Sequence, residues 1–294
     1  MLLREIKNVF HAELDPLYDK EEVDSFFYLL IEYFLGLDRF VLAIQPHLII
    51  SKENEEPMFE ALSRLKLNEP VQHIIGKTHF MDMEFVVNKN VLIPRPETEE
   101  LVRWIVGEVA GQAFQAKSGP LKILDIGTGS GCIAISLAKH IPEAEVFALD
   151  VSEEALQVAK ENAMVNKVEI ELVNSDVLEL ESLDIHFDII VSNPPYVREL
   201  EKNEMQKNVL EHEPHLALFV TNENPLLFYE RITGFALKNL KIGGRLFFEI
   251  NQYLGKETER LLRDHNFSEI EVRKDMFGND RMLRGIKVHK TTAL

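Results

Sequence analysis

The sequence predicts an α/β fold with a mostly parallel sheet, preceded by a small all-helical region. Two observations predict it. Apolar residues recur at three- and four-residue spacing through residues 1–70, which is typical of amphipathic helices. From residue 121 onward, short apolar strands alternate with helices, and this alternation indicates a parallel sheet covered on both faces. The length of 294 residues fits about two domains.

Residues 1–70 are expected to form the small helical domain. Breaks between helices are expected at Gly36 and Pro46, and Ser51 is expected to cap the helix that follows it. The region holds seven basic and fourteen acidic residues, a net charge of −7. Most of these carboxylates are expected to form an ordinary solvated surface. As a docking domain, this region would suit a partner other than a polyphosphate.

Residues 71–95 are expected to form a β-hairpin that links two domains. Phe80 and the run 85–87 flank a short Met-Asp-Met segment, as the strands of a hairpin would. Pro96 is placed to open a helix, and the acidic residues after it suit a helix N-terminus. Residues 96–294 are then expected to form the largest domain.

Strands and helices alternate through this domain in the order that a parallel sheet requires. The apolar runs are short and are separated by helical patterns. Strands are expected at 121–126, 145–149, 168–173, 187–192 and 245–250, helices at 133–141, 153–165, 225–240 and 253–265, and a closing pair of strands near Ile270 and Ile286.

Composition excludes several classes of protein. The formal net charge of −17 argues against tight non-specific binding to nucleic acid, since that affinity comes from cationic side chains. No apolar stretch reaches the roughly 18 residues of a membrane helix, and no secretory signal is expected. Cys132 is the single cysteine, which excludes an internal disulfide and a multi-cysteine zinc site and fits the cytoplasm. The ten histidines show no metal-ligand spacing, so we expect no metal.

A glycine-rich loop follows the first predicted strand. The sequence Asp-Ile-Gly-Thr-Gly-Ser-Gly runs from Asp125 to Gly131. Glycines let the backbone approach a ligand closely, and the helix start behind them offers free N–H donors. Asp150, at the end of the next strand, can bind both ribose hydroxyls of a nucleoside. This pattern predicts a cofactor of the nucleotide type, a dinucleotide or S-adenosylmethionine (SAM), and the absence of a Lys-Ser/Thr pair excludes a P-loop. Cys132 behind the loop is expected to be a small buried residue.

The sequence Asn-Pro-Pro-Tyr follows the fourth predicted strand, at residues 193–196. Two prolines stiffen the backbone and carry no N–H, which leaves nearby carbonyls free to accept hydrogen bonds. Asn193 adds a side-chain carbonyl, so two acceptors can bind both hydrogens of a planar NH2 group. Tyr196 can pack against the plane of that group. The motif therefore predicts a site for an amide or amino substrate at the open end of a parallel sheet.

With these two motifs, the chain resembles the HemK/PrmC family, the N5-glutamine methyltransferases of peptide chain release factors. Asn-Pro-Pro-Tyr is shared with DNA adenine methyltransferases, but the string Ile-Pro-Arg-Pro-Glu-Thr-Glu before the glycine loop is more specific. The resemblance spans about residues 70 to 285. The matching pieces are Gly76, Phe80, Val91 to Glu99, the glycine loop, Val191 to Tyr196, Glu213-Pro214, Ala217-Leu218, Gly278 and Asp280-Arg281.

The resemblance implies a Rossmann-like class I SAM-dependent methyltransferase domain with a seven-stranded, mostly parallel sheet. It implies SAM as cofactor, release factors as protein substrates, and no direct contact with nucleic acid or membrane. Arg95 and Glu97 would lie beside the active-site mouth, although helix capping and an interdomain ion pair explain them equally well. Val177 stands where the family often has a large aromatic residue. The implied cofactor residues are Gly127, Thr128, Gly129, Ser130, Gly131, Asp150, Asp176, Val177 and Asn193, and the implied substrate residues are Asn193, Pro194, Pro195, Tyr196, Arg95 and Glu97.

The expected reaction is a direct displacement on the glutamine of a Gly-Gly-Gln motif, with Asn193, Pro194 and Tyr196 as the catalytic residues. The sequence identifies no general base, and we expect a monomer. Two alternatives keep the chemistry and change the substrate: glutamine on a ribosomal protein, or adenine or cytosine in nucleic acid. A non-catalytic SAM-binding protein and a nicotinamide oxidoreductase both leave the Asn-Pro-Pro-Tyr motif unexplained.

Overall fold

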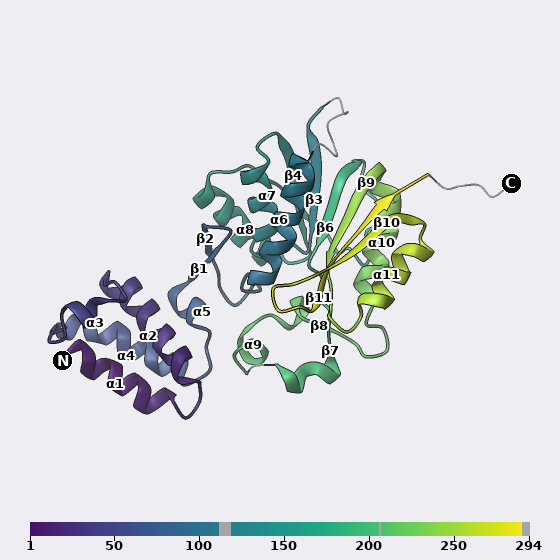
Figure 1. Ribbon diagram of the computed structural model, residues 1–294. Coiled ribbons are helices and arrows are strands. Elements are labelled where there is room, and N and C mark those ends of the chain that lie inside the picture. The colour runs from purple at the N-terminus through teal and green to yellow at the C-terminus, as the bar shows by residue number, and fades with distance from the viewer. Residues whose placement is uncertain (112–118, 206, 290–294) are drawn as a thin grey trace. The chain divides into compact units, whose positions relative to one another are not determined.

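The computed structural model describes residues 1–111, 119–205 and 207–289, and the chain divides into two compact units (Figure 1). The first unit comprises Met1–Lys77 together with the short helix α9 (Lys207–His212). The second comprises Thr78–Met205 and the chain from Glu213 onward. No helix in these described ranges is long and apolar enough to cross a membrane.

The first unit is helical, as predicted. Its aromatic core includes Phe10 and Phe27, whose rings meet edge to face with centroids 5.5 Å apart. Gly36 ends the second helix in the left-handed conformation at φ 62°, and Ser51 caps the fourth by accepting a hydrogen bond from the N–H of Asn54. The helices are α1 (Leu3–Leu14), α2 (Lys20–Leu35), α3 (Val41–Ile44), α4 (Lys52–Leu65) and α5 (Val71–Ile75).

Helix α9 joins this unit although it lies far along the chain. Nδ2 of Asn68 donates to Oε2 of Glu211 over 3.3 Å, and Nε2 of His212 lies 2.9 Å from the carbonyl oxygen of Leu67. Sequence periodicity did not predict this helix, because six residues are too few to show a helical period.

The predicted hairpin is present as β1 (Lys77–Phe80) and β2 (Met83–Val86). It is shorter than the expected range 71–95, whose first residues form the helix α5. The two residues between the strands have positive φ angles, 50° at Met81 and 59° at Asp82, which suit the twist of a two-residue hairpin turn. Asn162 holds β2 in place: its Oδ1 accepts from the N–H of Val86 and its Nδ2 donates to the same residue's carbonyl. The hairpin is thereby bonded to helix α8 (Glu153–Asn166).

The second unit is built on the seven-stranded, mostly parallel sheet that the sequence predicted. The strand order is β10-β11-β9-β6-β3-β4-β5, with antiparallel pairing only where β11 meets β9 and β10. A separate pair, β7 (Val197–Arg198) and β8 (Phe219–Val220), lies outside it. The seven strands are β3 (Leu121–Ile126), β4 (Ala144–Asp150), β5 (Glu171–Asn174), β6 (Phe187–Ser192), β9 (Leu240–Glu249), β10 (Phe267–Lys274) and β11 (Asp280–Lys287).

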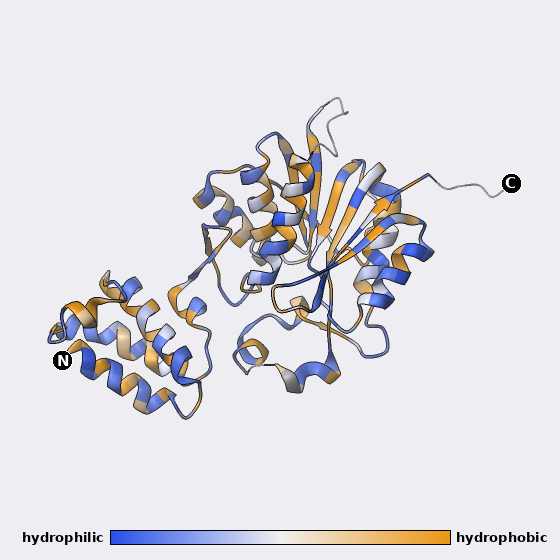
Figure 2. Cartoon of the chain, viewed as in Figure 1, coloured by the Kyte–Doolittle hydropathy of each residue, from blue (hydrophilic) through white to orange (hydrophobic). Residues whose placement is uncertain are grey.

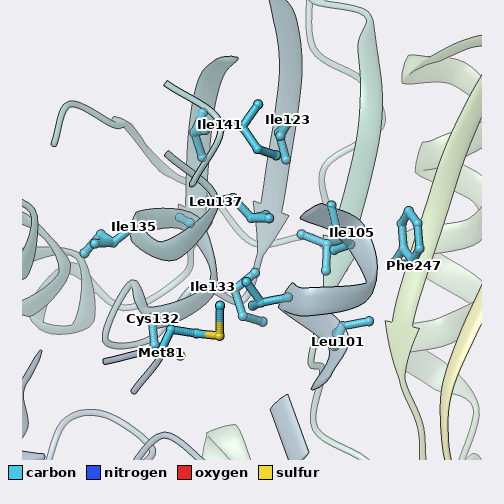
Figure 3. Close-up of a cluster of buried hydrophobic side chains, with 14 of the residues drawn as sticks. Met81, Leu101, Ile105, Ile123, Cys132, Ile133, Ile135, Leu137, Ile141 and Phe247 are labelled. Carbon is cyan, nitrogen blue, oxygen red and sulfur yellow. The ribbon is translucent and has the colours of Figure 1, made fainter. Parts of the chain in front are cut away.

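Helices cover both faces of this sheet, and the strands between them are mainly hydrophobic (Figures 1 and 2). Helices α6 (Pro96–Ala110), α7 (Cys132–His140) and α8 lie on one face, and α10 (Leu227–Asn239) and α11 (Gly255–Asp264) on the other. On the first face, side chains of α6 and α7 gather against the sheet (Figure 3). Every residue of β6 is buried, as expected of a central strand covered on both sides.

Two strands begin more than one residue away from the sequence prediction. Strand β5 begins at Glu171 rather than Val168, because the N–H of Val168 bonds to the carbonyl of Ala163 and so closes the end of α8. Strand β9 begins at Leu240 rather than Arg245. The intervening Gly243-Gly244 form part of an irregularity in its pairing with β6 and do not precede the strand.

Candidate active site

The site lies where the strand order reverses. Strand β3 pairs in parallel with β4 on one side and with β6 on the other, so that Ile126 is opposite both Leu149 and Ser192. The next strand out, β5, pairs its Asn174 with Asp150. The carboxyl ends of these strands therefore emerge at one edge, which is the usual place for a ligand in an open α/β sheet.

The glycine loop leaves β3 with its backbone open on one side. Gly127 and Gly129 have φ angles of 73° and 54°, and a Cβ added to either would meet nothing within 4 Å. Gly131 is packed instead, since a Cβ there would come within 2.8 Å of Cδ1 of Ile135. The loop thus combines close packing against α7 with open space at its first two glycines, which fits a ligand lying along the backbone.

The buried carboxyl group of Asp125 is hydrogen-bonded to this loop and to the helix that follows it. Oδ2 of Asp125 accepts hydrogen bonds from Oγ1 of Thr128 at 2.6 Å and from the N–H of Ala134 at 3.2 Å. Burial raises the pKa of Asp125 to about 7, although these two hydrogen bonds act in the opposite direction. Its Oδ1 has no hydrogen-bond partner in the described ranges. Ser130 is also buried, and its carbonyl accepts from Nδ2 of Asn162.

Asp150 lies at the end of β4, next to the glycine loop. Its Oδ2 accepts from the N–H of Gly129 at 2.8 Å, and its Oδ1 accepts from the N–H of Ser152 at 3.0 Å. Burial raises the pKa of Asp150, and these N–H groups partly offset that rise. A carboxylate has about four lone-pair sites, so Asp150 keeps acceptor capacity beyond its bonds to backbone N–H groups. Its geometry fits a pair of adjacent hydroxyl groups.

Asp176 and Val177 follow β5 at the same edge. The N–H of Ser175 bonds to the carbonyl of Asp150 over 3.1 Å, which ties the two strand ends together. Oδ1 of Asp176 accepts from the N–H of Leu178, and Val177 is buried in the hydrophobic cluster on the α10 side of the sheet.

Asn193 and Pro194 present two hydrogen-bond acceptors at the end of β6. Nδ2 of Asn193 donates to Oγ1 of Thr98 over 3.3 Å. Within the part of the chain that the structure describes, no hydrogen bond ends on Oδ1 of Asn193 or on the Pro194 carbonyl. Pro194 is buried and Pro195 partly buried. Two rigidly held acceptors at this position fit a substrate that offers an NH2 group.

Tyr196 ends the motif in a polar network. Its hydroxyl donates to Oε1 of Glu249 over 3.0 Å, and Nη1 of Arg281 lies 3.4 Å from the same hydroxyl. Burial, and then the charge of Glu249, raise the pKa of Tyr196. The phenol therefore stays neutral at physiological pH and acts as a hydrogen-bond donor.

Glu249, at the end of β9, was not predicted from the sequence. It is 1% exposed, and its Oε2 accepts from Oγ1 of Thr98 at 2.6 Å. Burial raises the pKa of this carboxyl, while the hydrogen bonds from Thr98 and Tyr196 act to lower it. One signal could have found it: an acidic residue that directly follows an apolar run and precedes Ile250 at the ligand edge of the sheet.

Arg95 and Glu97 lie near this network. Arg95 precedes α6 without a side-chain capping bond, and its guanidinium pairs with buried Glu213, which also accepts from the N–H of Ile93. That ion pair lies within the second unit, so it does not join the two units. The charge of Glu97 contributes to the raised pKa of Glu249.

Cys132 is a buried residue of the hydrophobic cluster, as predicted. Burial raises the pKa of its thiol to about 12, so the thiol is not ionised at physiological pH and is a poor nucleophile.

The sheet order, the open glycine loop with Asp150 and the two acceptors of Asn193-Pro194 together define a SAM-dependent methyltransferase. Two family models match the chain: "PrmC N-terminal domain" at residues 5–76 and "Methyltransferase small domain" at residues 112–217. The release factor glutamine methyltransferase of Flavobacterium psychrophilum is 51% identical over 97% of this chain and 99% of its own length. That of Bacteroides thetaiotaomicron is 42% identical over 96% and 99%.

The fold also matches solved structures. A methyltransferase from Pyrococcus furiosus has a TM-score of 0.51 at 18% identity, with 81% of this chain and all of that one covered. This likeness supports the fold alone. The identity to the curated relatives goes further: the chain belongs to the release factor glutamine methyltransferase family. The predicted family, fold class, enzyme class and cofactor are thereby confirmed.

Proposed function

We propose that this protein transfers the methyl group of SAM to the side-chain amide nitrogen of the glutamine in the Gly-Gly-Gln motif of class 1 release factors. The observation that carries the proposal is a pair of acceptors, Oδ1 of Asn193 and the carbonyl of Pro194, at the strand edge beside the glycine loop. Among the described residues, neither has a hydrogen-bond donor. The curated relatives, named release factor glutamine methyltransferases, supply the substrate class.

The residues of the cofactor half fit SAM. Gly127 and Gly129 leave room along the backbone for the methionine portion, and Asp150 has free lone pairs for the ribose hydroxyls. We assign Thr128, Ser130 and Gly131 to the same loop, and Asp176 with Val177 to the adenine side. SAM, when bound, supplies an electrophilic methyl group on a sulfonium centre.

The residues of the substrate half activate a poor nucleophile. The lone pair of an amide nitrogen is delocalised into its carbonyl. Acceptors at both N–H groups raise the electron density on nitrogen and hold it in one orientation, which removes rotational freedom before the reaction. We assign this role to Asn193 and Pro194, and we assign the packing against the amide plane to Tyr196 and Pro195. Methylation releases one proton from the nitrogen, and we propose that it leaves to water.

The remaining assignments concern docking and context. We propose that Arg95, held by Glu213, and Glu97 border the mouth of the substrate site. The acidic helical region, residues 1–70, would dock the release factor, and residues 71–95 would link it to the catalytic domain, residues 96–294. We propose that the protein acts as a monomer in the cytoplasm, where release factors meet the ribosome.

The decisive experiment measures methyl transfer from labelled SAM to a purified release factor. The control is the same factor with its Gly-Gly-Gln glutamine changed to alanine. We expect label on the first factor only. Label on both would place the reaction at another residue. Label on neither, with SAM binding intact by calorimetry, would overturn the release factor as substrate and direct the search to ribosomal proteins and nucleic acid.

A further inference from the structure

Thr98 lies between the substrate motif and a buried carboxylate. It is in the first turn of α6 and is 2% exposed. Its Oγ1 donates to Oε2 of Glu249 at 2.6 Å and accepts from Nδ2 of Asn193 at 3.3 Å. A hydroxyl has one proton, and that of Thr98 lies in the shorter of these two contacts, the 2.6 Å hydrogen bond to Oε2 of Glu249. The Thr98 proton therefore goes to Glu249, and its lone pair faces Asn193.

The direction of this hydrogen bond decides which end of the Asn193 amide faces the site. An Asn side chain has a donor end and an acceptor end that differ little in shape. If Thr98 presents a lone pair, only the NH2 end of Asn193 can bind it, and Oδ1 points away. If Thr98 presented its proton, Oδ1 would turn inward and the NH2 group would face the substrate. A substrate NH2 group would then meet donors in place of an acceptor.

The same carboxylate holds the other end of the motif. Oε1 of Glu249 accepts from the hydroxyl of Tyr196, while Oε2 accepts from Thr98. Strands β6 and β9 are neighbours, with Ser192 opposite Phe248, so their next residues, Asn193 and Glu249, emerge side by side. The two oxygens of Glu249 thus each accept from a hydroxyl and fix the direction of both.

We propose that Thr98 and Glu249 are positioning residues that set the orientation of the Asn193 amide, so that its carbonyl oxygen faces the substrate NH2 group. The proposal rests on the proposed function, in which that oxygen binds the glutamine amide. It implies that the specificity for an NH2 substrate is set by a residue that does not touch the substrate.

A substitution that preserves the shape of Thr98 tests whether its hydroxyl sets the orientation of the Asn193 amide. Thr98→Val removes the hydroxyl, and Thr98→Ser keeps it. Thr233→Val is the matched control, because Thr233 is fully buried in α10 and its hydroxyl has no hydrogen-bond partner in the described part of the chain. All three variants are compared by thermal unfolding, so that a loss of folding is recognised.

The first readout does not depend on any substrate. The side-chain amide signals of Asn193 are assigned in the free protein by nitrogen-15 NMR, from their loss in Asn193→Asp. We expect Thr98→Val to shift them and to speed their exchange with water by about tenfold, since a hydrogen bond is lost. Thr98→Ser and Thr233→Val should leave the signals as in the wild type. Signals unchanged in Thr98→Val would overturn the proposal.

The second readout is a double-mutant cycle on methyl transfer to the release factor. We expect Thr98→Val to lower kcat by about tenfold with KM for both substrates within about twofold, and Thr98→Ser to restore most of the loss. In the Asn193→Ala background, Thr98→Val should have no further effect, because its action passes through Asn193. Independent, multiplying effects would overturn the proposal. If the wild-type protein methylates no release factor, the proposed function fails. The NMR measurement still decides whether Thr98 orients the Asn193 amide.

Discussion

The hydroxyl of Tyr196 donates to Oε1 of Glu249 over 3.0 Å, which joins the end of the Asn-Pro-Pro-Tyr motif to the carboxyl end of β9. The phenol remains a donor because burial raises its pKa. Arg281 reaches the same hydroxyl and is itself bound to Asp275, so the antiparallel end of the sheet also supports the motif.

Tyr196→Phe should remove the hydrogen bond to Glu249 while the aromatic ring keeps its packing. The ring remains, but Glu249 loses one of its two hydroxyl donors. We expect a loss of about 1–2 kcal/mol in the free energy of unfolding, measured in urea, and a lower kcat. Tyr229→Phe is the matched control, because that buried hydroxyl bonds the backbone carbonyl of Glu249 and not the carboxylate. Its kcat should stay near the wild-type value, and an equal fall in both variants would contradict a specific role for Tyr196.

Asn193→Ala should reduce turnover while leaving the cofactor bound. The lost acceptor acts on the substrate amide, so we expect kcat to fall by about 100-fold or more, with the dissociation constant of SAM within about tenfold of the wild type. Single-turnover kinetics and calorimetry measure the two quantities. Near-normal turnover would refute the proposal that Asn193 binds the substrate amide.

Asp150→Ala should weaken cofactor binding more than it lowers turnover. Its carboxylate organises the N–H groups of Gly129 and Ser152 and has lone pairs left for ribose hydroxyls. We expect SAM binding to weaken by about tenfold or more, with a smaller effect on kcat at saturating SAM. Glu171→Ala, which removes an exposed carboxylate from the next strand, is the control for net charge. Unchanged SAM affinity in Asp150→Ala would remove this residue from the ribose site.

The free energy of unfolding of Asp125→Asn, relative to that of the wild type, should be higher at high pH than at low pH. The Asp125 pKa is about 7 in the folded state and about 3.9 in an unfolded chain, so between these values only the folded state holds the proton. Wild-type stability therefore falls as pH rises through this window. The amide introduced by the substitution does not titrate, and its carbonyl can accept from Thr128 and Ala134 as Oδ2 of the aspartate does.

The quantity to compare is the difference in unfolding free energy between Asp125→Asn and the wild type, from urea titrations without SAM. Titrating groups that do not interact with Asp125 cancel in this difference. It should shift by about 2–3 kcal/mol in favour of the variant between about pH 5 and pH 8. A difference independent of pH would mean that Asp125 is ionised throughout and that burial does not raise its pKa.

Local pattern was sufficient for most of the fold. The mainly apolar run of β6 and the capping residue Ser51 mark their elements without reference to the rest of the chain, and the structure confirms both. The turn was predicted at the Met-Asp-Met segment, residues 81–83, and the structure forms it with Met81 and Asp82 alone. The start of β9 was missed for a tertiary reason, because its pairing with β6 includes Gly243-Gly244 in the strand.

The sequence by itself determined the two motifs of the site, because the glycine loop and Asn-Pro-Pro-Tyr each lie within one short stretch after an apolar strand. Only the tertiary structure decided which residues hold these two motifs in place. Thr98 lies 95 residues before Asn193 and 151 before Glu249, and Arg95 lies 118 before Glu213. Which strand ends are neighbours depends on the order β9-β6-β3-β4, and no local periodicity encodes that order. Packing of the whole sheet brings a buried carboxylate beside the amide that it orients.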